Sequence, residues 1–208
     1  MDKVLQGKKV AVLVETEYIA QEVAYYKSFF TAQGAEVDFM TYLLGKPERT
    51  IVSDVTEVGQ KVETMLVKKE IADCNPNDYA IVITAANYVA CRLREIPPMG
   101  SLGSTELLRS PAAVRFMAGA MMNPQIVKGA LCHALWILTP VPELLRGRKV
   151  ICHTVVLADV CNAGGIYVPD ESHVVVDRDL VTGRSAQDLQ LYCDTLLATY
   201  RKRSSVSI

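Results

Sequence analysis

The first forty residues carry a strand, helix, strand pattern, which limits the fold more than any other feature of this sequence. An apolar, mostly β-branched run at residues 10–14 ends at an acid, which indicates a strand buried on both faces. Apolar residues then recur at helical spacing over residues 18–32, and Gly34 stands where a helix commonly ends. A second strand is predicted at residues 36–42. Such short connections are typical of a parallel sheet, so we predict an α/β fold.

The rest of the chain continues this alternation. Strands are predicted at residues 79–84, 125–131, 148–153, 174–177 and 180–182, and helices at residues 112–122, 133–145, 155–163 and 186–200. Two β-rich patches, at residues 50–55 and 62–67, predict a hairpin-like excursion. Residues 86–110 are the least periodic segment, which predicts a long surface loop of the kind that is often functional. No repeat or linker interrupts the chain, so residues 1–208 are expected to form a single domain.

Composition excludes several classes of protein. Half of the 208 residues are apolar, which is enough for a sizeable core and argues against disorder. The net charge of -1 argues against binding to nucleic acid or to a membrane surface through bulk charge. The apolar run near the start is too short for a signal peptide, and the longest uncharged run, residues 129–142, is shorter than the roughly 18 residues that a membrane span needs. We therefore expect a soluble, cytoplasmic protein.

The cysteines predict free thiols. The six are spread through the chain without a CxxC pair or a Cys/His cluster, at positions Cys74, Cys91, Cys132, Cys152, Cys161 and Cys193. This spacing disfavours a disulfide framework and a structural zinc site. No phosphate loop or dinucleotide fingerprint is present either. We expect neither a metal nor a cofactor.

Cys132 is the strongest candidate for chemistry. It follows the predicted strand 125–131 and opens the predicted helix 133–145, between Ala130 and Ala134. Ligands collect at the carboxyl ends of the strands in open α/β sheets, and a nucleophile at a strand-to-helix turn is exposed there. A helix N-terminus behind the sulfur would favour the thiolate. The alternative is a buried cysteine at a strand end that does no chemistry.

Motifs along nearly the whole chain resemble those of one superfamily. In order they are KKVAVLV at residues 8–14, QGAEV at 33–37, ALCH at 130–133, LRGRKV at 145–150, DVCNAGGIYV at 159–168 and VVVDRDLVTGR at 174–184. The chain resembles a divergent member of the DJ-1/ThiJ/PfpI superfamily, which is similar to class I glutamine amidotransferases. The resemblance implies a flavodoxin-like three-layer sandwich, a homodimer or larger assembly, and a cysteine at the elbow. Members include PfpI-type proteases, chaperones, glyoxalase-like proteins, isonitrile hydratases and silent relatives, so the resemblance leaves the reaction open.

The resemblance also implies roles for individual residues. Cys132 matches the elbow cysteine, and His133 matches the histidine that follows it in the protease-like branch. His153 matches a histidine that faces the cysteine in another branch. A histidine on a neighbouring strand end reaches the sulfur more easily than the next residue in the chain. We therefore favour His153 slightly over His133 as the base, and a structural role remains the alternative for each.

When the sequence is aligned with the family pattern, the acid expected after the first strand is missing. Relatives place a glutamate or aspartate after the first strand, hydrogen-bonded to the cysteine, and an ungapped match from residue 8 to residue 37 puts Ile19 there. Glu17 is the only obvious substitute in that loop, although an exposed loop acid is the alternative. Tyr18 and Ile19 are assigned to the pocket. The thiolate would then depend on the helix dipole and a histidine.

Two further departures concern the pocket. Ala85, Ala86 and Asn87 stand where relatives have a glycine pair that contributes to an oxyanion hole. We expect the amides of Ala86 and His133 to supply that hole, unless it is closed. The segment before the cysteine is also longer than in relatives, which predicts an inserted loop around residues 94–110 that reshapes or covers the pocket.

These observations support two functional hypotheses. The first is a cysteine-dependent enzyme of the hydrolase, hydratase or lyase type, in which Cys132 attacks a small electrophilic molecule and a histidine moves the proton. The second is a non-catalytic or redox-responsive protein that binds a ligand or responds to stress. In both, the partners are a small molecule and a second copy of the chain, without nucleic acid or membrane.

Overall fold

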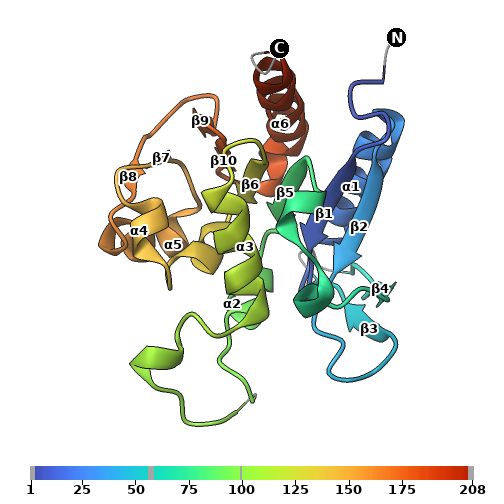
Figure 1. Ribbon diagram of the computed structural model, residues 1–208, viewed down its shortest axis with the longest axis vertical. Coiled ribbons are helices and arrows are strands. Elements are labelled where there is room, and N and C mark those ends of the chain that lie inside the picture. Colours follow the sequence, from blue (N-terminus) through green and yellow to red (C-terminus); the bar gives the residue numbers. More distant parts are fainter. Residues whose placement is uncertain (1–2, 56–58, 99, 206–208) are drawn as a thin grey trace.

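A six-stranded sheet forms the centre of the computed structural model, which describes residues 3–55, 59–98 and 100–205 (Figure 1). Its strands are β1 (Lys9–Leu13), β2 (Glu36–Met40), β5 (Ile81–Thr84), β6 (Val127–Leu131), β9 (Val174–Asp177) and β10 (Leu180–Gly183). They lie in the order β2-β1-β5-β6-β10-β9. All neighbours are parallel except the antiparallel pair β9 and β10. The predicted α/β fold with a mainly parallel sheet is confirmed.

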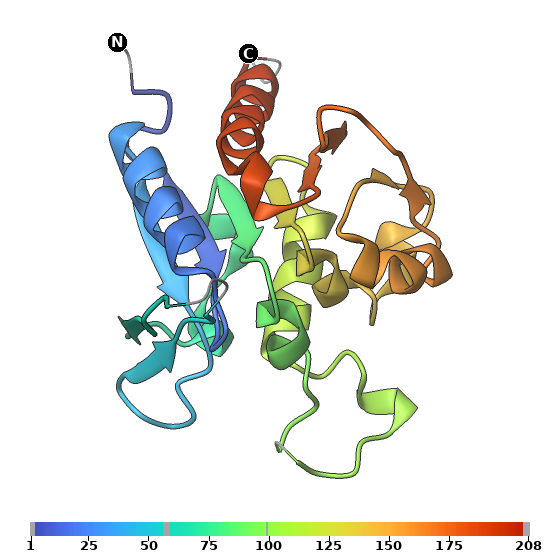
Figure 2. The same ribbon diagram turned by 180° about the vertical axis from the view of Figure 1, so that it is seen from behind.

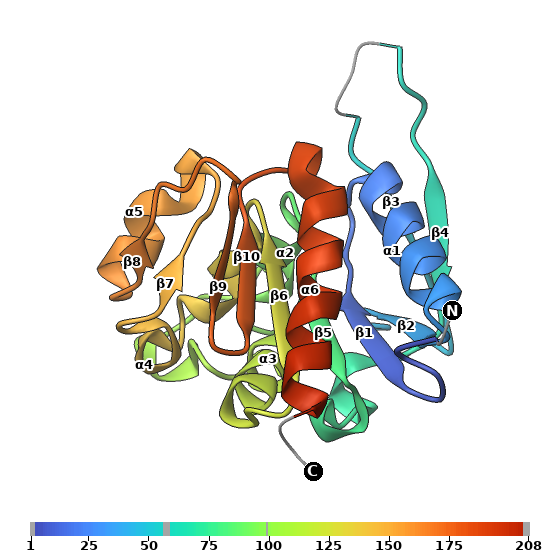
Figure 3. The same ribbon diagram turned by 90° about the horizontal axis from the view of Figure 1, so that it is seen from above.

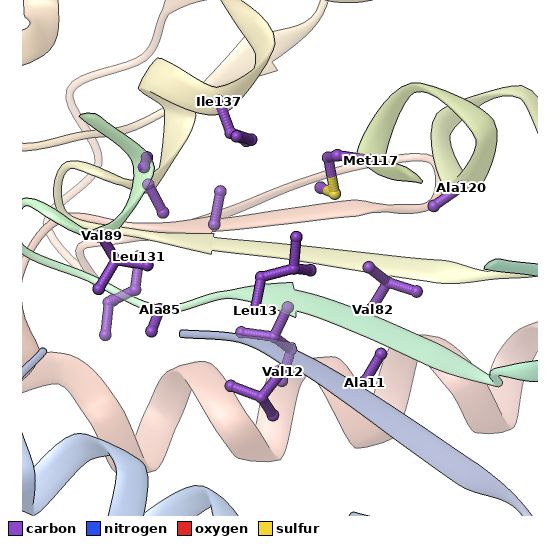
Figure 4. Close-up of a cluster of buried hydrophobic side chains, with 14 of the residues drawn as sticks. Ala11, Val12, Leu13, Val82, Ala85, Val89, Met117, Ala120, Leu131 and Ile137 are labelled. Carbon is purple, nitrogen blue, oxygen red and sulfur yellow. The ribbon is translucent and has the colours of Figure 1, made fainter. Parts of the chain in front are cut away.

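The middle strands are buried because helices cover both faces of the sheet. Every residue of β5 and β6 is buried, and the register places Val10 of β1 beside Ile81 of β5. Near-continuous apolar runs of this kind are what a parallel sheet covered on both faces requires. Figure 4 shows Met117 and Ala120 packing towards the sheet from one side. The core therefore lies on both faces of β1, β5 and β6.

The helices divide between these faces. Helices α1 (Ala20–Ala32) and α6 (Leu189–Ser204) lie side by side on one face, while α2 (Val89–Leu93) and α3 (Ala112–Met122) lie on the other (Figure 3). The short helices α4 (Pro142–Leu145) and α5 (Thr154–Asn162) lie beyond the β9 side of the sheet (Figure 3). None of the helices in the described ranges is long and apolar enough to cross a membrane.

Two small sheets lie outside the main one. Strands β3 (Arg49–Val52) and β4 (Thr64–Val67) are antiparallel, which confirms the predicted excursion. Strands β7 (Lys149–Val150) and β8 (Ile166–Tyr167) form a parallel pair. Only two residues of the predicted strand at 148–153, Lys149 and Val150, form a strand, so the prediction is wrong for the others. This strand does not join the main sheet: β7 pairs with β8, and β6 has β5 and β10 as its neighbours.

Two other elements differ from the sequence prediction. The predicted helix 133–145 is a 3-10 helix, Ala134–Leu138, followed by the separate α4, because Pro140 and Pro142 lack the amide that a continuous helix needs. The predicted loop 86–110 begins with α2. After Leu93 it does run as a loop with one 3-10 turn, Thr105–Leu107, and projects away from the sheet (Figure 2). That this loop is an insertion remains a prediction. The prediction that residues 1–208 form a single domain also remains untested.

Candidate functional site

Cys132 stands in a strained backbone conformation directly after β6. Its φ is 59°, in the left-handed region that residues other than glycine rarely adopt. Its amide donates to the carbonyl of Gly183 over 2.8 Å, and its carbonyl accepts from the amide of His153 over 3.2 Å. These contacts fix the backbone on two sides, and the side chain is half-buried. The cysteine is thus held at the carboxyl end of a central strand.

Three residues with positive φ gather at this end of the sheet. Glu17 (70°), Asn87 (62°) and Cys132 (59°) lie beyond β1, β5 and β6, which are neighbours in the sheet. The Asn87 side chain donates to the carbonyl of Glu17 over 2.9 Å and to the carboxylate of Asp54 over 2.8 Å, which holds its conformation. Strain that the surroundings maintain in this way is concentrated at functional sites.

A buried acid lies beside the cysteine. Glu22, in the first turn of α1, has no exposed surface. One of its carboxylate oxygens accepts from the Tyr26 hydroxyl over 2.7 Å, and both accept from the Ala86 amide, over 2.9 and 3.1 Å. Burial raises the pKa of the Glu22 carboxyl from 4.5 to about 7, although these hydrogen bonds oppose the rise. The carboxyl therefore changes its charge near neutral pH.

The Cys132 thiol is held in its neutral form. Burial, and secondly the charge of Glu22, raise its pKa from 9.0 to about 12, while hydrogen bonds from the Asn87 and His133 amides oppose the rise. The prediction that a helix N-terminus stabilises the thiolate is wrong here. The helix that follows is a 3-10 helix of five residues, and burial of the sulfur is the largest cause of the raised pKa.

The prediction that no acid lies near Cys132 is also wrong, because Glu22 influences it. Ile19, where the alignment put the acid, precedes α1 and packs against the core. Glu22 lies three residues after Ile19, which is nearly one helical turn further along the chain. A signal for it exists in the sequence, since Glu22, Tyr26 and Phe30 follow one another at intervals of four on the buried side of α1.

The other loop residues take different positions. The carboxylate of Glu17 is paired with Arg92 over 2.7 Å and is about one-third exposed (36%). Tyr18 is buried, and its hydroxyl donates to the carbonyl of Glu63 over 3.5 Å. The amides of Ala85 and Ala86 donate to Leu13 and to Glu22. The expected use of the Ala86 amide in an oxyanion hole is therefore wrong, and the amides that contact the sulfur belong to Asn87 and His133.

Both predicted histidines lie near Cys132 without bonding to its sulfur. Their ring centroids are 5.0 Å apart. Burial and the neighbouring His153 lower the pKa of His133 to about 4, so its ring is neutral at pH 7. The Nδ1 atom of His153 accepts from the amide of Val155 over 3.2 Å and caps α5. No hydrogen bond within the described ranges joins either ring to the sulfur of Cys132.

An aromatic cluster, which the sequence analysis did not identify, borders the cysteine. It comprises Tyr88, His133, Trp136 and His153. The His133 ring lies 5.6 Å from that of Tyr88 and 5.3 Å from that of Trp136, centroid to centroid. The Trp136 indole donates to Asp159 over 2.6 Å, and the guanidinium of Arg94 lies 5.6 Å from its ring. These residues come from separate segments, so no local pattern predicts the cluster.

A cavity of about 720 Å³ adjoins the exposed side of Tyr88, and its lining includes Arg92, Arg94, Ile96, Leu108 and Thr139. It therefore lies between α2, the projecting loop and the segment that follows the 3-10 helix. Within the part of the chain that the structure describes, no three His, Cys, Asp or Glu side chains are grouped closely enough to hold a metal ion. Of the aromatic cluster, Tyr88 lines the cavity, and Cys132 is not among its lining residues.

Comparison with known proteins identifies the family. The model of the DJ-1/PfpI family matches residues 96–199. An uncharacterized protein of Staphylococcus aureus is 31% identical over 182 residues, which cover 88% of this chain and 92% of that protein. The Bacillus subtilis protein named "Putative cysteine protease YraA" is 24% identical over 191 residues, covering 89% and 94%. The chain belongs to the DJ-1/PfpI family.

Solved structures share the fold. A ThiJ/PfpI domain protein from Brachyspira murdochii has a TM-score of 0.73 at 10% identity, covering 95% of this chain and 98% of its own. DJ-1 from Schizosaccharomyces pombe has a TM-score of 0.66 at 16% identity, covering 95% and 97%. The chain spans 47% of a two-domain protein from Anabaena variabilis that combines a DJ-1/ThiJ/PfpI-like domain with a ferritin-like one, at 22% identity, 92% coverage of this chain and a TM-score of 0.74.

Proposed function

We propose that the protein is a cysteine-dependent enzyme in which Cys132 is an elbow nucleophile that attacks a small carbonyl, amide or nitrile-like compound. The observation that carries the proposal is the placement of Cys132. Its strained backbone follows a central strand, and its sulfur is next to a buried acid and two backbone amides. Hydrolase, hydratase and lyase reactions all begin with this attack.

Glu22 is the best-placed base for the first step. As the sulfur forms a bond to the electrophilic carbon, the thiol proton moves to the Glu22 carboxylate. The π electrons of the attacked double bond move to its oxygen or nitrogen. A base with a pKa of about 7 suits proton transfer at neutral pH. This assignment replaces the histidine that we favoured from the sequence, because the charge of Glu22 acts on the pKa of the thiol and neither histidine ring contributes to it.

The amides of Asn87 and His133 support the same step. Both donate towards the sulfur and so stabilise the negative charge that develops there when the proton leaves. The neutral His133 ring lies in the aromatic cluster with His153, and their ring centroids are 5.0 Å apart. The name of the Bacillus subtilis relative, which describes a cysteine protease, is in keeping with cysteine chemistry.

The second hypothesis is a ligand-binding or redox-responsive protein. The pKa of about 12 favours it, since a thiol that stays protonated at neutral pH is a poor free nucleophile. The two hypotheses differ in whether the acid beside the sulfur moves a proton during turnover.

Labelling and a substrate screen test the proposal. The protein is incubated with small aldehydes, amides and nitriles, and intact-mass analysis followed by peptide mapping locates any adduct. We expect adducts on Cys132 and turnover that Cys132→Ser abolishes. Cys161→Ser, at an exposed cysteine, is the matched control and should retain turnover. Turnover that survives in Cys132→Ser would refute the covalent mechanism.

A further inference from the structure

The ring of Tyr88 has no part in the proposed proton transfer, yet it contacts the ring of His133, the residue that follows Cys132. Tyr88 directly follows Asn87, whose amide contacts the sulfur of Cys132. Its side chain is 42% exposed, while the next ring in the cluster, His133, is 9% exposed. Tyr88 therefore presents an exposed aromatic surface next to the residues that adjoin the nucleophile, Asn87 and His133.

The neighbouring residues hold this surface in place. The Tyr88 ring meets His133 edge to face, at an interplanar angle of 68°, and lies 6.3 Å from the Trp136 ring. Trp136 is fixed in turn by its hydrogen bond to Asp159 and by Arg94, which also donates to the Thr139 hydroxyl over 2.6 Å. A ligand that stacks on Tyr88 would meet a surface that is already ordered, which lowers the entropy lost on binding.

The cavity beside Tyr88 supplies room for a whole ligand. Its volume of about 720 Å³ falls in the range of small-molecule sites. Arg92 is neutralised by its ion pair with Glu17, and Arg94 is engaged with Trp136 and Thr139. No strong single-sign charge dominates the lining, so the cavity suits an uncharged molecule.

We infer that the substrate carries a planar aromatic or heteroaromatic ring within a few bonds of its electrophilic carbon, and that Tyr88 is the specificity-determining residue that stacks on this ring. The inference rests on the proposed function, because it places the electrophile at Cys132. Aromatic rings pair with centroids about 4.5–7 Å apart, a spacing that the exposed face of Tyr88 allows. The remainder of the molecule lies in the adjoining cavity.

Two chloroacetamides of matched size test the inference. 2-Chloroacetanilide carries a planar ring, and N-cyclohexyl-2-chloroacetamide carries a saturated one. Each reacts with a thiol in the same way: a carbon–sulfur bond forms, the carbon–chlorine bond breaks, chloride leaves and the thiol proton passes to Glu22 or to solvent. The rate of Cys132 modification is measured by peptide mass mapping and divided by the rate of the same reagent with glutathione.

We expect the normalised rate for the anilide to exceed that for the cyclohexyl reagent by about threefold to tenfold, the range that an aromatic pair contributes. Tyr88→Leu should bring this ratio near one, whereas Tyr88→Phe should keep it. Equal normalised rates in the unmutated protein, or a preference that persists in Tyr88→Leu, would overturn the inference and leave the proposed function standing. If neither reagent modifies Cys132 in the folded protein, the proposed function fails and the inference fails with it.

Discussion

Replacing Glu22 with glutamine is the sharpest perturbation of the site. The change keeps the shape of the side chain and an oxygen that can accept from Tyr26 and Ala86, and it removes the charge. We expect two effects of opposite sign. Cys132 should become more reactive towards a simple alkylating agent, and turnover of a substrate should fall.

The size of the first effect follows from the pKa of Cys132. Burial and Glu22 together raise it from 9.0 to about 12, so about one thiol in 100,000 is ionised at pH 7. The charge of Glu22 is the second cause after burial. Removing this charge should lower the pKa of Cys132 and so increase the thiolate fraction above pH 7. Below pH 7 the glutamate is already mostly protonated, so the two proteins should react alike.

The second effect follows from the role of Glu22 as the base. General-base help contributes about 100-fold to 10,000-fold to a rate, which exceeds the gain in thiolate. Turnover of any substrate found should therefore fall in Glu22→Gln, and its rise with pH through about 7 should disappear. This rise occurs in the unmutated protein because the ionised carboxylate is the active form.

Iodoacetamide labelling from pH 5.5 to 9.5, with peptide mapping of Cys132, measures the first effect, and initial rates of turnover measure the second. Glu36→Gln is the matched control, because Glu36 is exposed and paired with Lys9 at 3.6 Å, outside the site. The reasoning is refuted if Glu22→Gln does not accelerate labelling above pH 7, since Cys132 would then not respond to the charge of Glu22. It is refuted equally if turnover persists with an unchanged pH profile.

Three further predictions concern stability and assembly. The pKa of Glu22 is higher in the folded state than its ordinary 4.5, so the stability it confers is present below pH 4.5 and lost as the pH rises to about 7. In urea unfolding, the free energy of unfolding of Glu22→Gln should increase by about 3 kcal/mol relative to that of the unmutated protein as the pH rises from 4.5 to 8. A difference between the two proteins that does not change with pH would contradict this. The ammonium group of Lys128 is fully buried, 2.5 Å from Asp179, so Lys128→Met should cost about 3 kcal/mol in the same assay; the exposed Lys149→Met is the control and should cost much less. We also predict a homodimer or larger assembly, and light scattering that gives a stable monomer of 22.9 kDa at micromolar concentration would disprove it.

The sequence predicts the central sheet well because its strands are unambiguous. The runs around β1 and β5 are apolar, short and bounded by polar or turn residues, so their burial can be read locally. The segment at residues 148–153 has an equally strand-like pattern, but β7 pairs with β8 while β6 pairs with β10. Which strands pair depends on residues distant in the chain, and local patterns do not contain that information.

The candidate site, like the fold, could be predicted only in part from the sequence. Cys132 is found from its place between a strand and a helix, because that place is a local property. Glu22 was missed because an ungapped alignment ignores the turn between Glu15 and α1, although its spacing with Tyr26 gives a signal. Tyr88 and Trp136 come together only through tertiary packing.

The hydrogen bonds between Glu22 and the Ala86 amide join the first turn of α1 to the end of β5. An unpaired amide at this fully buried position would cost about 1–3 kcal/mol. Natural selection for a stable fold would therefore preserve an acceptor here, either glutamate or glutamine, even in a descendant that had lost all catalysis. Retention of an acceptor at this position among relatives is not evidence that they share a reaction, whereas retention of an ionisable glutamate together with the cysteine and the strained backbone beneath it would be.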